Sequence, residues 1–141
     1  MASQVVRLAD LVTAELGATA FDLPCSVRRE YRPRYEPKDL VTVQLTVVPR
    51  ELNIEPAAAS KTWWTCRIDI AVQKKLAADE DIEPLIDLTE QVAEQFTNWR
   101  PADMPEAVCM TSTVDPLYAD EHLDALHTFT AVVELTFRIL K

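Results

Sequence analysis

The sequence predicts an α+β domain, with a largely antiparallel sheet of four to five strands and two helices packed on one face. Three observations lead to this fold class. Several segments place apolar residues at every second position, which is typical of strands that bury one face. Two other segments have apolar residues at helical spacing. The chain of 141 residues fits one domain, over 1–141, without repeats or linkers. We expect the order helix, three strands, helix, two strands.

The first helix is expected over residues 4–16, ended by Gly17, the single glycine of the chain. Its apolar stripe consists of Val5, Leu8, Ala9, Val12 and Leu16. The following segment, "SVRREYRPRYEP" from Ser26, has an extended character. Pro33 and Pro37 confine it to a sheet edge or an arm, because proline cannot donate to a strand ladder.

Residues 40–48 and 62–74 alternate strictly and predict two further strands, the first of them ended by Pro49. The connection over residues 50–61 is long for a hairpin loop. Strict alternation gives the sheet one apolar face under the helices and one polar face that is left uncovered.

A second helix is expected over residues 81–98, with Pro84 in its first turn and Pro101 after its end. Residues 107–114 and 128–140 alternate again and predict the last two strands. The segment between these strands, "DPLYADEHLDALH", is expected to be irregular with a helical turn.

Composition excludes several classes of site. P-loops, dinucleotide-binding turns and nucleophile elbows need glycines that this chain lacks. A net charge of −9 argues against wrapping nucleic acid. Cys25, Cys66 and Cys109 form no CxxC pair and are expected to be reduced and buried. His122 and His127 are expected to be exposed or capping residues. We therefore predict no catalytic residue, no metal and no cofactor.

Two concentrations of charge stand out. The second helix carries acids on the face opposite its apolar stripe, with no interleaved base: Glu83, Asp87, Glu90 and Glu94. The proline-limited segment carries the opposite charge: Arg28, Arg29, Arg32 and Arg34. Nucleic acid, a neighbour's acidic helix, or plain solvation of two unrelated patches would each account for the arginines. In an acidic protein we favour the helix of a neighbouring copy, and predict a subunit interface.

The long 50–61 connection is mildly apolar and suits docking into another protein, although a mobile surface loop is an equal alternative. The predicted docking residues are Leu52, Asn53, Ile54, Glu55 and Pro56. Together with the charged segments, this loop describes a subunit that contacts copies of itself.

The stretches "RPRYEPKDLVTVQLTVVPRELNIEPAAASK", "IDIAVQKKL" and "DPLYADEHLDALHTFTAVVELTFRILK" resemble bacteriophage and prophage proteins of the tail terminator or tail completion type. The resemblance extends from Arg32 to the C-terminus. It implies a virion protein, assembled in the bacterial host cytoplasm, that forms a hexameric ring at the head-proximal end of the tail tube. The ring would end tube polymerisation, join the tail to a head-completion protein and pass genome DNA through its lumen.

A DNA conduit should avoid dense arginine and lysine, because these bind phosphate tightly. The polar sheet face meets this condition, so we predict that it lines the lumen: Thr42, Gln44, Thr46, Thr128 and Thr130. Expected partners are copies of the chain, the tail tube protein and a head-completion protein, with DNA only in passage and no membrane. A head-completion or adaptor neck protein is the first alternative, and a small-ligand-binding α+β domain is the second.

Overall fold

The computed structural model describes residues 3–33 and 40–141. Along these residues the elements are α1 (Gln4–Ala18), β1 (Cys25–Arg29), β2 (Val43–Pro56), β3 (Thr62–Lys75), the short 3-10 helix η2 (Asp79–Asp81), α2 (Ile82–Gln95), β4 (Ala107–Val114), α3 (Asp120–Leu126) and β5 (Thr128–Leu140). The predicted α+β class is confirmed. The additional helix α3 occupies the segment that was expected to be irregular with a helical turn.

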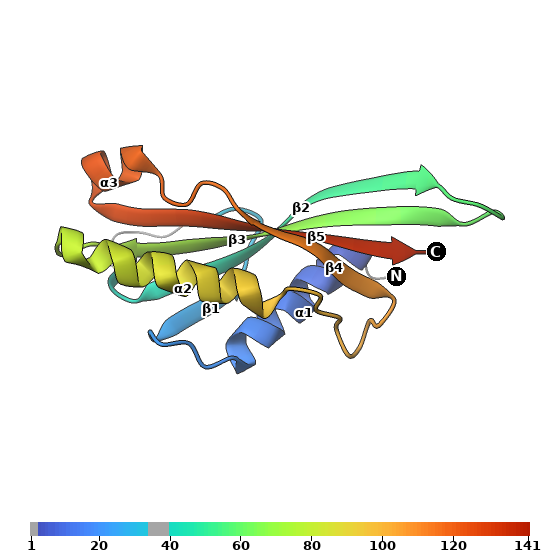
Figure 1. Ribbon diagram of the computed structural model, residues 1–141, viewed down its shortest axis with the longest axis horizontal. Helices are drawn as coiled ribbons and strands as arrows, with labels where there is room; N and C mark the ends of the chain where they lie inside the picture. The colour runs from blue at the N-terminus through green and yellow to red at the C-terminus, as the bar shows by residue number, and fades with distance from the viewer. Residues whose placement is uncertain (1–2, 34–39) are drawn as a thin grey trace.

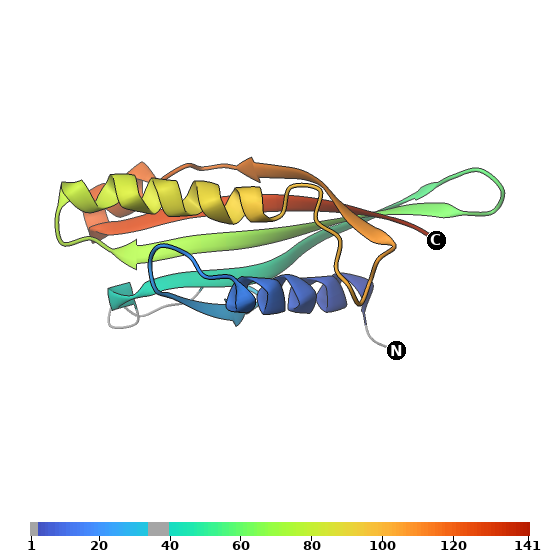
Figure 2. The same cartoon turned by 60° about the horizontal axis from the view of Figure 1, so that its bottom comes forward.

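The five strands form one sheet in the order β1-β2-β3-β5-β4. β1 runs parallel to β2, and every other neighbouring pair is antiparallel. Figure 2 shows α1 and α2 on the same face of the sheet, displaced from one another along its length. α1 packs over β1 and β2, and α2 packs over β5 and β4. The core lies between this pair of helices and the sheet.

Helix α1 begins where the side chain of Ser3 accepts a hydrogen bond of 3.3 Å from the backbone N–H of Val6. The predicted stripe is buried at Leu8, Ala9, Val12 and Leu16. Gly17 does not stop the helix, which ends one residue later at Ala18, where the Thr19 N–H bonds to the Leu16 carbonyl. The glycine is therefore helical.

Helix α2 spans Ile82–Gln95, after η2, and Pro84 lies in its first turn as predicted. It ends earlier than expected, and the chain turns at Asn98, whose φ is 58°. Phe96 and Trp99 pack edge to face, with ring centroids 5.0 Å apart. Trp99 also contacts the ring of Phe137 from β5. These aromatic contacts fix the end of α2 to the sheet.

Strand β2 corrects one prediction. It starts at Val43 rather than Leu40, and it continues through Pro49 to Pro56. A β-bulge between Pro49 and Glu51 interrupts its register with β3. Pro49 is tolerated because β1 pairs with β2 only as far as Val47, so the proline lies on an edge. The connection to β3 is therefore a short loop over 57–61.

The segment from Ser26 was predicted to form a sheet edge or an arm. Its described start belongs to β1, which is the first strand of the sheet and pairs with β2 alone among the described residues. β3 was predicted to end one residue earlier than it does, and β4 and β5 have the predicted bounds. β5 has the predicted alternation. Every second residue from Phe129 to Ile139 lies on the helix side and is completely buried.

Candidate interaction surfaces

The most prominent feature of the molecule is a long hairpin formed by residues 50–67, which extends past the ends of both helices (Figure 1). Leu52 pairs with Cys66 and Ile54 pairs with Trp64, so these apolar side chains lie on the helix-facing side. Leu52 is 42% and Ile54 is 48% exposed. All five predicted docking residues are exposed, but they belong to a strand and not to a loop.

The bulge at Arg50 decides which face each hairpin residue occupies. Before it, Val43, Leu45 and Val47 point to the core, and after it the even-numbered residues Leu52 and Ile54 lie on the same side of the sheet but beyond the core. Without the extra residue, the two apolar side chains would lie on the polar face, because a one-residue slip inverts the alternation. The bulge thus gives the hairpin one apolar and one polar side.

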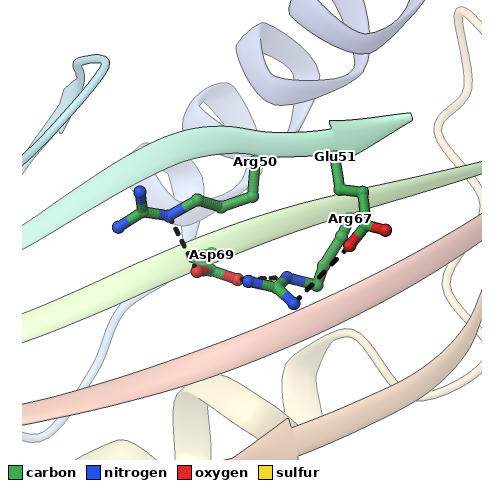
Figure 3. Close-up of polar contacts among 4 residues, drawn as sticks. All are labelled: Arg50, Glu51, Arg67 and Asp69. Atoms are coloured by element: carbon green, nitrogen blue, oxygen red, sulfur yellow. Dashed lines mark hydrogen bonds and ion pairs between the residues drawn. The ribbon is translucent and has the colours of Figure 1, made fainter.

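An ion cluster lies at the base of the hairpin (Figure 3). Asp69 is 5% exposed and receives a hydrogen bond of 3.1 Å from Arg50 Nε to its Oδ2. Arg67 Nε approaches Asp69 Oδ1 at 3.3 Å as an ion pair without hydrogen-bond alignment, and its Nη1 lies 3.7 Å from Glu51 Oε2. The cluster therefore joins the bulge residue Arg50 and the following Glu51 to β3.

The alternation of residues 62–74 places Arg67 and Asp69 on the polar face, but it does not show that Arg50 is their partner. The sequence contains two signs of this bulge and its ion cluster. The alternation of β2 resumes out of phase after Arg50, and Asp69 is an acid in the middle of an apolar strand. A phase change of this kind indicates a bulge.

The predicted arginine surface is divided between several environments. Arg28 is exposed on the polar face of β1, opposite Thr46 of β2. Arg29 points to the helix side, where it forms an ion pair with Asp10 of α1 and lies 5.0 Å from the ring centroid of Tyr31. Arg32 is exposed, and Arg34 lies outside the described residues. Arg29 is therefore already neutralised within its own chain.

The predicted acidic face of α2 is present, since Glu83, Asp87, Glu90 and Glu94 are all exposed. Gln91 donates hydrogen bonds from Nε2 to Asp22 at 2.7 Å and to Asp87 at 3.2 Å. Glu94 lines a cleft of about 390 Å³ between the ends of α1 and α2, together with Thr19, Ala20, Phe21, Gln91 and Gln95. Whether a neighbour's arginines meet this face stays a prediction.

The predicted lumen lining is corrected. Gln44, Thr46, Thr128 and Thr130 are all less than 10% exposed within a single chain, and Thr42 is only half-buried. Part of the cover comes from α3, because His122 Nδ1 lies 2.7 Å from Thr130 Oγ1. The Ala119 N–H also bonds to the Thr130 carbonyl. These four side chains are not available to line a channel.

The histidines and cysteines have structural surroundings. His122 is the half-buried partner of Thr130, while His127 is exposed and ends α3 with a φ of 48°. All three cysteines are free thiols, with Cys66 and Cys109 buried and Cys25 half-buried. Burial raises the pKa of the Cys109 thiol to about 11, so this thiol stays protonated at neutral pH.

Among the described residues, no group of three or more His, Cys, Asp or Glu side chains is placed to hold a metal ion. A second cleft, of about 370 Å³, lies beside the start of α2 and is lined by Leu76, Ala77, Ala78, Asp79, Ile82, Leu123, Asp124 and His127. Within 3–33 and 40–141, no helix has the length and apolar character needed to span a bilayer.

Comparison with known proteins informs the fold alone. No protein-family model and no curated protein matches the sequence. Among solved structures, 27 chains match. One of them, whose title describes no function, has a TM-score of 0.57 and 14% identity over 99% of this chain and 96% of its own. At this identity the likeness shows a shared arrangement of helices and strands along the whole chain.

Proposed function

We propose that this protein is a structural virion protein of a long-tailed bacteriophage. In this proposal, six copies of the chain form a hexameric ring at the head-proximal end of the tail tube. The ring ends polymerisation of the tube and offers a surface to a head-completion protein, and genome DNA passes through its lumen. The resemblance of residues 32–141 to tail terminator proteins suggests this role.

The observation that carries the proposal is the projecting hairpin. Leu52 and Ile54 are half exposed on one side, and an ion cluster around the buried Asp69 joins the base of the hairpin to the sheet. A monomeric domain gains no stability from apolar side chains that a strand holds in water beyond its helices. Such a hairpin is suited to reach across the junction with a tube subunit.

The acidic face of α2 supports a second contact. In Figure 1 this helix lies toward the end of the molecule opposite the hairpin tip, so the two surfaces can meet different partners. Four exposed acids without an interleaved base repel one another, and a basic partner would relieve this repulsion. We propose that these acids bind arginines of a neighbouring copy, and Arg32 is one exposed candidate.

The test combines a mass measurement with tail assembly. The purified protein should form rings with six-fold symmetry by native mass spectrometry and negative-stain imaging. Replacing the apolar pair, as Leu52→Thr with Ile54→Thr, should leave a folded protein, because threonine suits exposed strand positions. In reconstitution, tails should then overgrow or fail to join heads.

The control is the double change Thr111→Ser with Thr113→Ser on exposed positions of β4. Tails of normal length that join heads with the Leu52 and Ile54 variant would contradict the hairpin as the contact with the tube. A stable monomer that adds only to an existing portal would instead support the adaptor alternative. A monomer that captures a small molecule would support the ligand-binding alternative.

A further inference from the structure

Within residues 3–33 and 40–141, the hairpin also has one strand edge without a pairing strand. β1 pairs with β2 only from Val43 to Val47, and one more backbone bond joins Glu30 N–H to the Val47 carbonyl. Beyond that point, the outer edge of β2 has no pairing strand among the described residues, although its inner edge pairs with β3 as far as Pro56. An exposed edge of this length is a template for another strand.

We propose that the outer edge of β2 over residues 51–55 pairs with the outer edge of β1 from a second copy of this chain, so that the sheet continues from subunit to subunit. This inference rests on the proposed function only in requiring self-association. It names the contact by which the copies join. The same chain cannot make this contact, because β1 and the hairpin lie at different parts of the molecule (Figure 2).

The two edges match face by face. On the polar side the β2 edge presents Glu51, Asn53 and Glu55, and the β1 edge presents Ser26 and Arg28. On the helix side, Leu52 and Ile54 would meet Cys25 and Val27, which are only half-buried in the single chain. The pairing would bury exposed apolar area and set an acid beside a base.

Both strand directions satisfy this match when Asn53 lies beside Ser26. In a parallel pair, Glu55 then faces Arg28 and Ile54 faces Val27. In an antiparallel pair, Glu51 faces Arg28 and Leu52 faces Val27. Asn53 therefore lies beside Ser26 in both arrangements. Whether Glu55 or Glu51 faces Arg28 distinguishes the parallel pair from the antiparallel pair.

Other edges fit less well. Two copies of the β2 edge paired about Asn53 would place Glu51 of one beside Glu55 of the other, and like charges directly opposite destabilise a sheet. The polar side of β4 presents Thr111 and Thr113, with no base to receive the glutamates. Charge therefore favours β1, and the contact joins different surfaces of two copies, which closes into a ring or continues as a filament.

Disulfide cross-linking tests the proposal directly. In a Cys25→Ala background, the variants Asn53→Cys and Ser26→Cys are prepared separately and then mixed under mild oxidation. The bond requires Cα atoms within roughly 7 Å, so it reports strand neighbours. We expect disulfide-linked dimers in the mixture and none in either variant alone. Links within Asn53→Cys alone, or between Asn53→Cys and Thr111→Cys, would overturn the proposal.

Charge exchange gives a second readout. Arg28→Glu should weaken association about tenfold or more, and either Glu55→Lys or Glu51→Lys should restore it. Glu80→Lys, on exposed η2, is the matched control and should have no effect. Rings that form without the Asn53–Ser26 link would overturn the edge contact and leave the proposed function standing. A chain that remains monomeric throughout would overturn both.

Discussion

Arg50 Nε donates a hydrogen bond of 3.1 Å to Asp69 Oδ2 across the β-bulge that sets the two sides of the hairpin. The carboxylate is buried between this guanidinium and that of Arg67. Because Asp69 lies on the polar sheet face at the base of the hairpin, its ion pairs link the orientation of the exposed arm to the main sheet.

Asp69→Ala should therefore destabilise the protein and loosen the hairpin. Removing one member of a fully buried ion pair costs several kcal/mol of stability. Because both arginines are partly exposed, we expect the free energy of unfolding to fall by only about 1–2 kcal/mol. Urea unfolding measures this loss, and hydrogen exchange at residues 50–56 should accelerate. The control Glu80→Ala, at an exposed acid, should change neither. Unaltered exchange in Asp69→Ala would mean that the cluster does not hold the bulge.

Two substitutions at the tip of the hairpin should stabilise the folded protein. Ala59 and Ser60 have φ values of 58° and 65°, and Lys61 N–H bonds to the Ala58 carbonyl at 3.3 Å. Two successive positive φ angles define a turn that favours Asn-Gly. Ala59→Asn with Ser60→Gly should raise the free energy of unfolding by about 1 kcal/mol, measured by urea unfolding.

Ala57→Gly is the control at the tip, since Ala57 has a negative φ and glycine there only adds freedom to the unfolded chain. It should be neutral or destabilising. A loss of stability in the Asn-Gly variant would contradict this turn geometry. Removing residues 50–61 altogether would delete residues of β2 that pair with β3, so the two-residue exchange is the milder test of the tip.

The buried thiol of Cys109 predicts loss of stability in alkaline solution. Its pKa rises from 9.0 to about 11 on folding, so the folded state holds this proton more tightly. The stabilising contribution is complete below pH 9 and is lost between about pH 9 and 11, up to roughly 2–3 kcal/mol. Cys109→Ala should flatten this part of the stability–pH curve. If the slope of stability against pH is unchanged in Cys109→Ala, other titrating groups cause the alkaline loss of stability.

Charge reversal tests the acidic face of α2. Glu90→Lys and Arg32→Glu should each weaken self-association, because each removes an attraction and adds a repulsion, and the double variant should regain part of it. Sedimentation at physiological salt measures the effect. Asp124→Lys, an exposed acid of α3, is the matched control. Normal assembly of both single variants would contradict this contact and leave the hairpin edge as the candidate.

Three features favour self-association without the resemblance. Leu52 and Ile54 are exposed on the projecting hairpin, the outer edge of β2 has no pairing strand among the described residues, and α2 exposes a face of acids alone. Separate substitutions test each of these three features, so a negative result for one contact leaves the other two open to test.

The sequence by itself determined the fold class and most elements, because alternation and helical spacing report directly which side chains are buried. β5 is the clearest case, with every second residue from Phe129 to Ile139 in the core. The acidic face of α2 was equally predictable, since a helix with one apolar stripe must expose the opposite face.

Tertiary structure alone decided how far β2 extends and what covers the polar face. Pro49 is compatible with a strand only where no outer neighbour exists, and the place where β1 stops cannot be read from β2 itself. Thr130 is polar by pattern yet buried, because α3 folds back onto it. Local periodicity shows which side of a strand is polar, and only the packing of distant segments decides whether water reaches it.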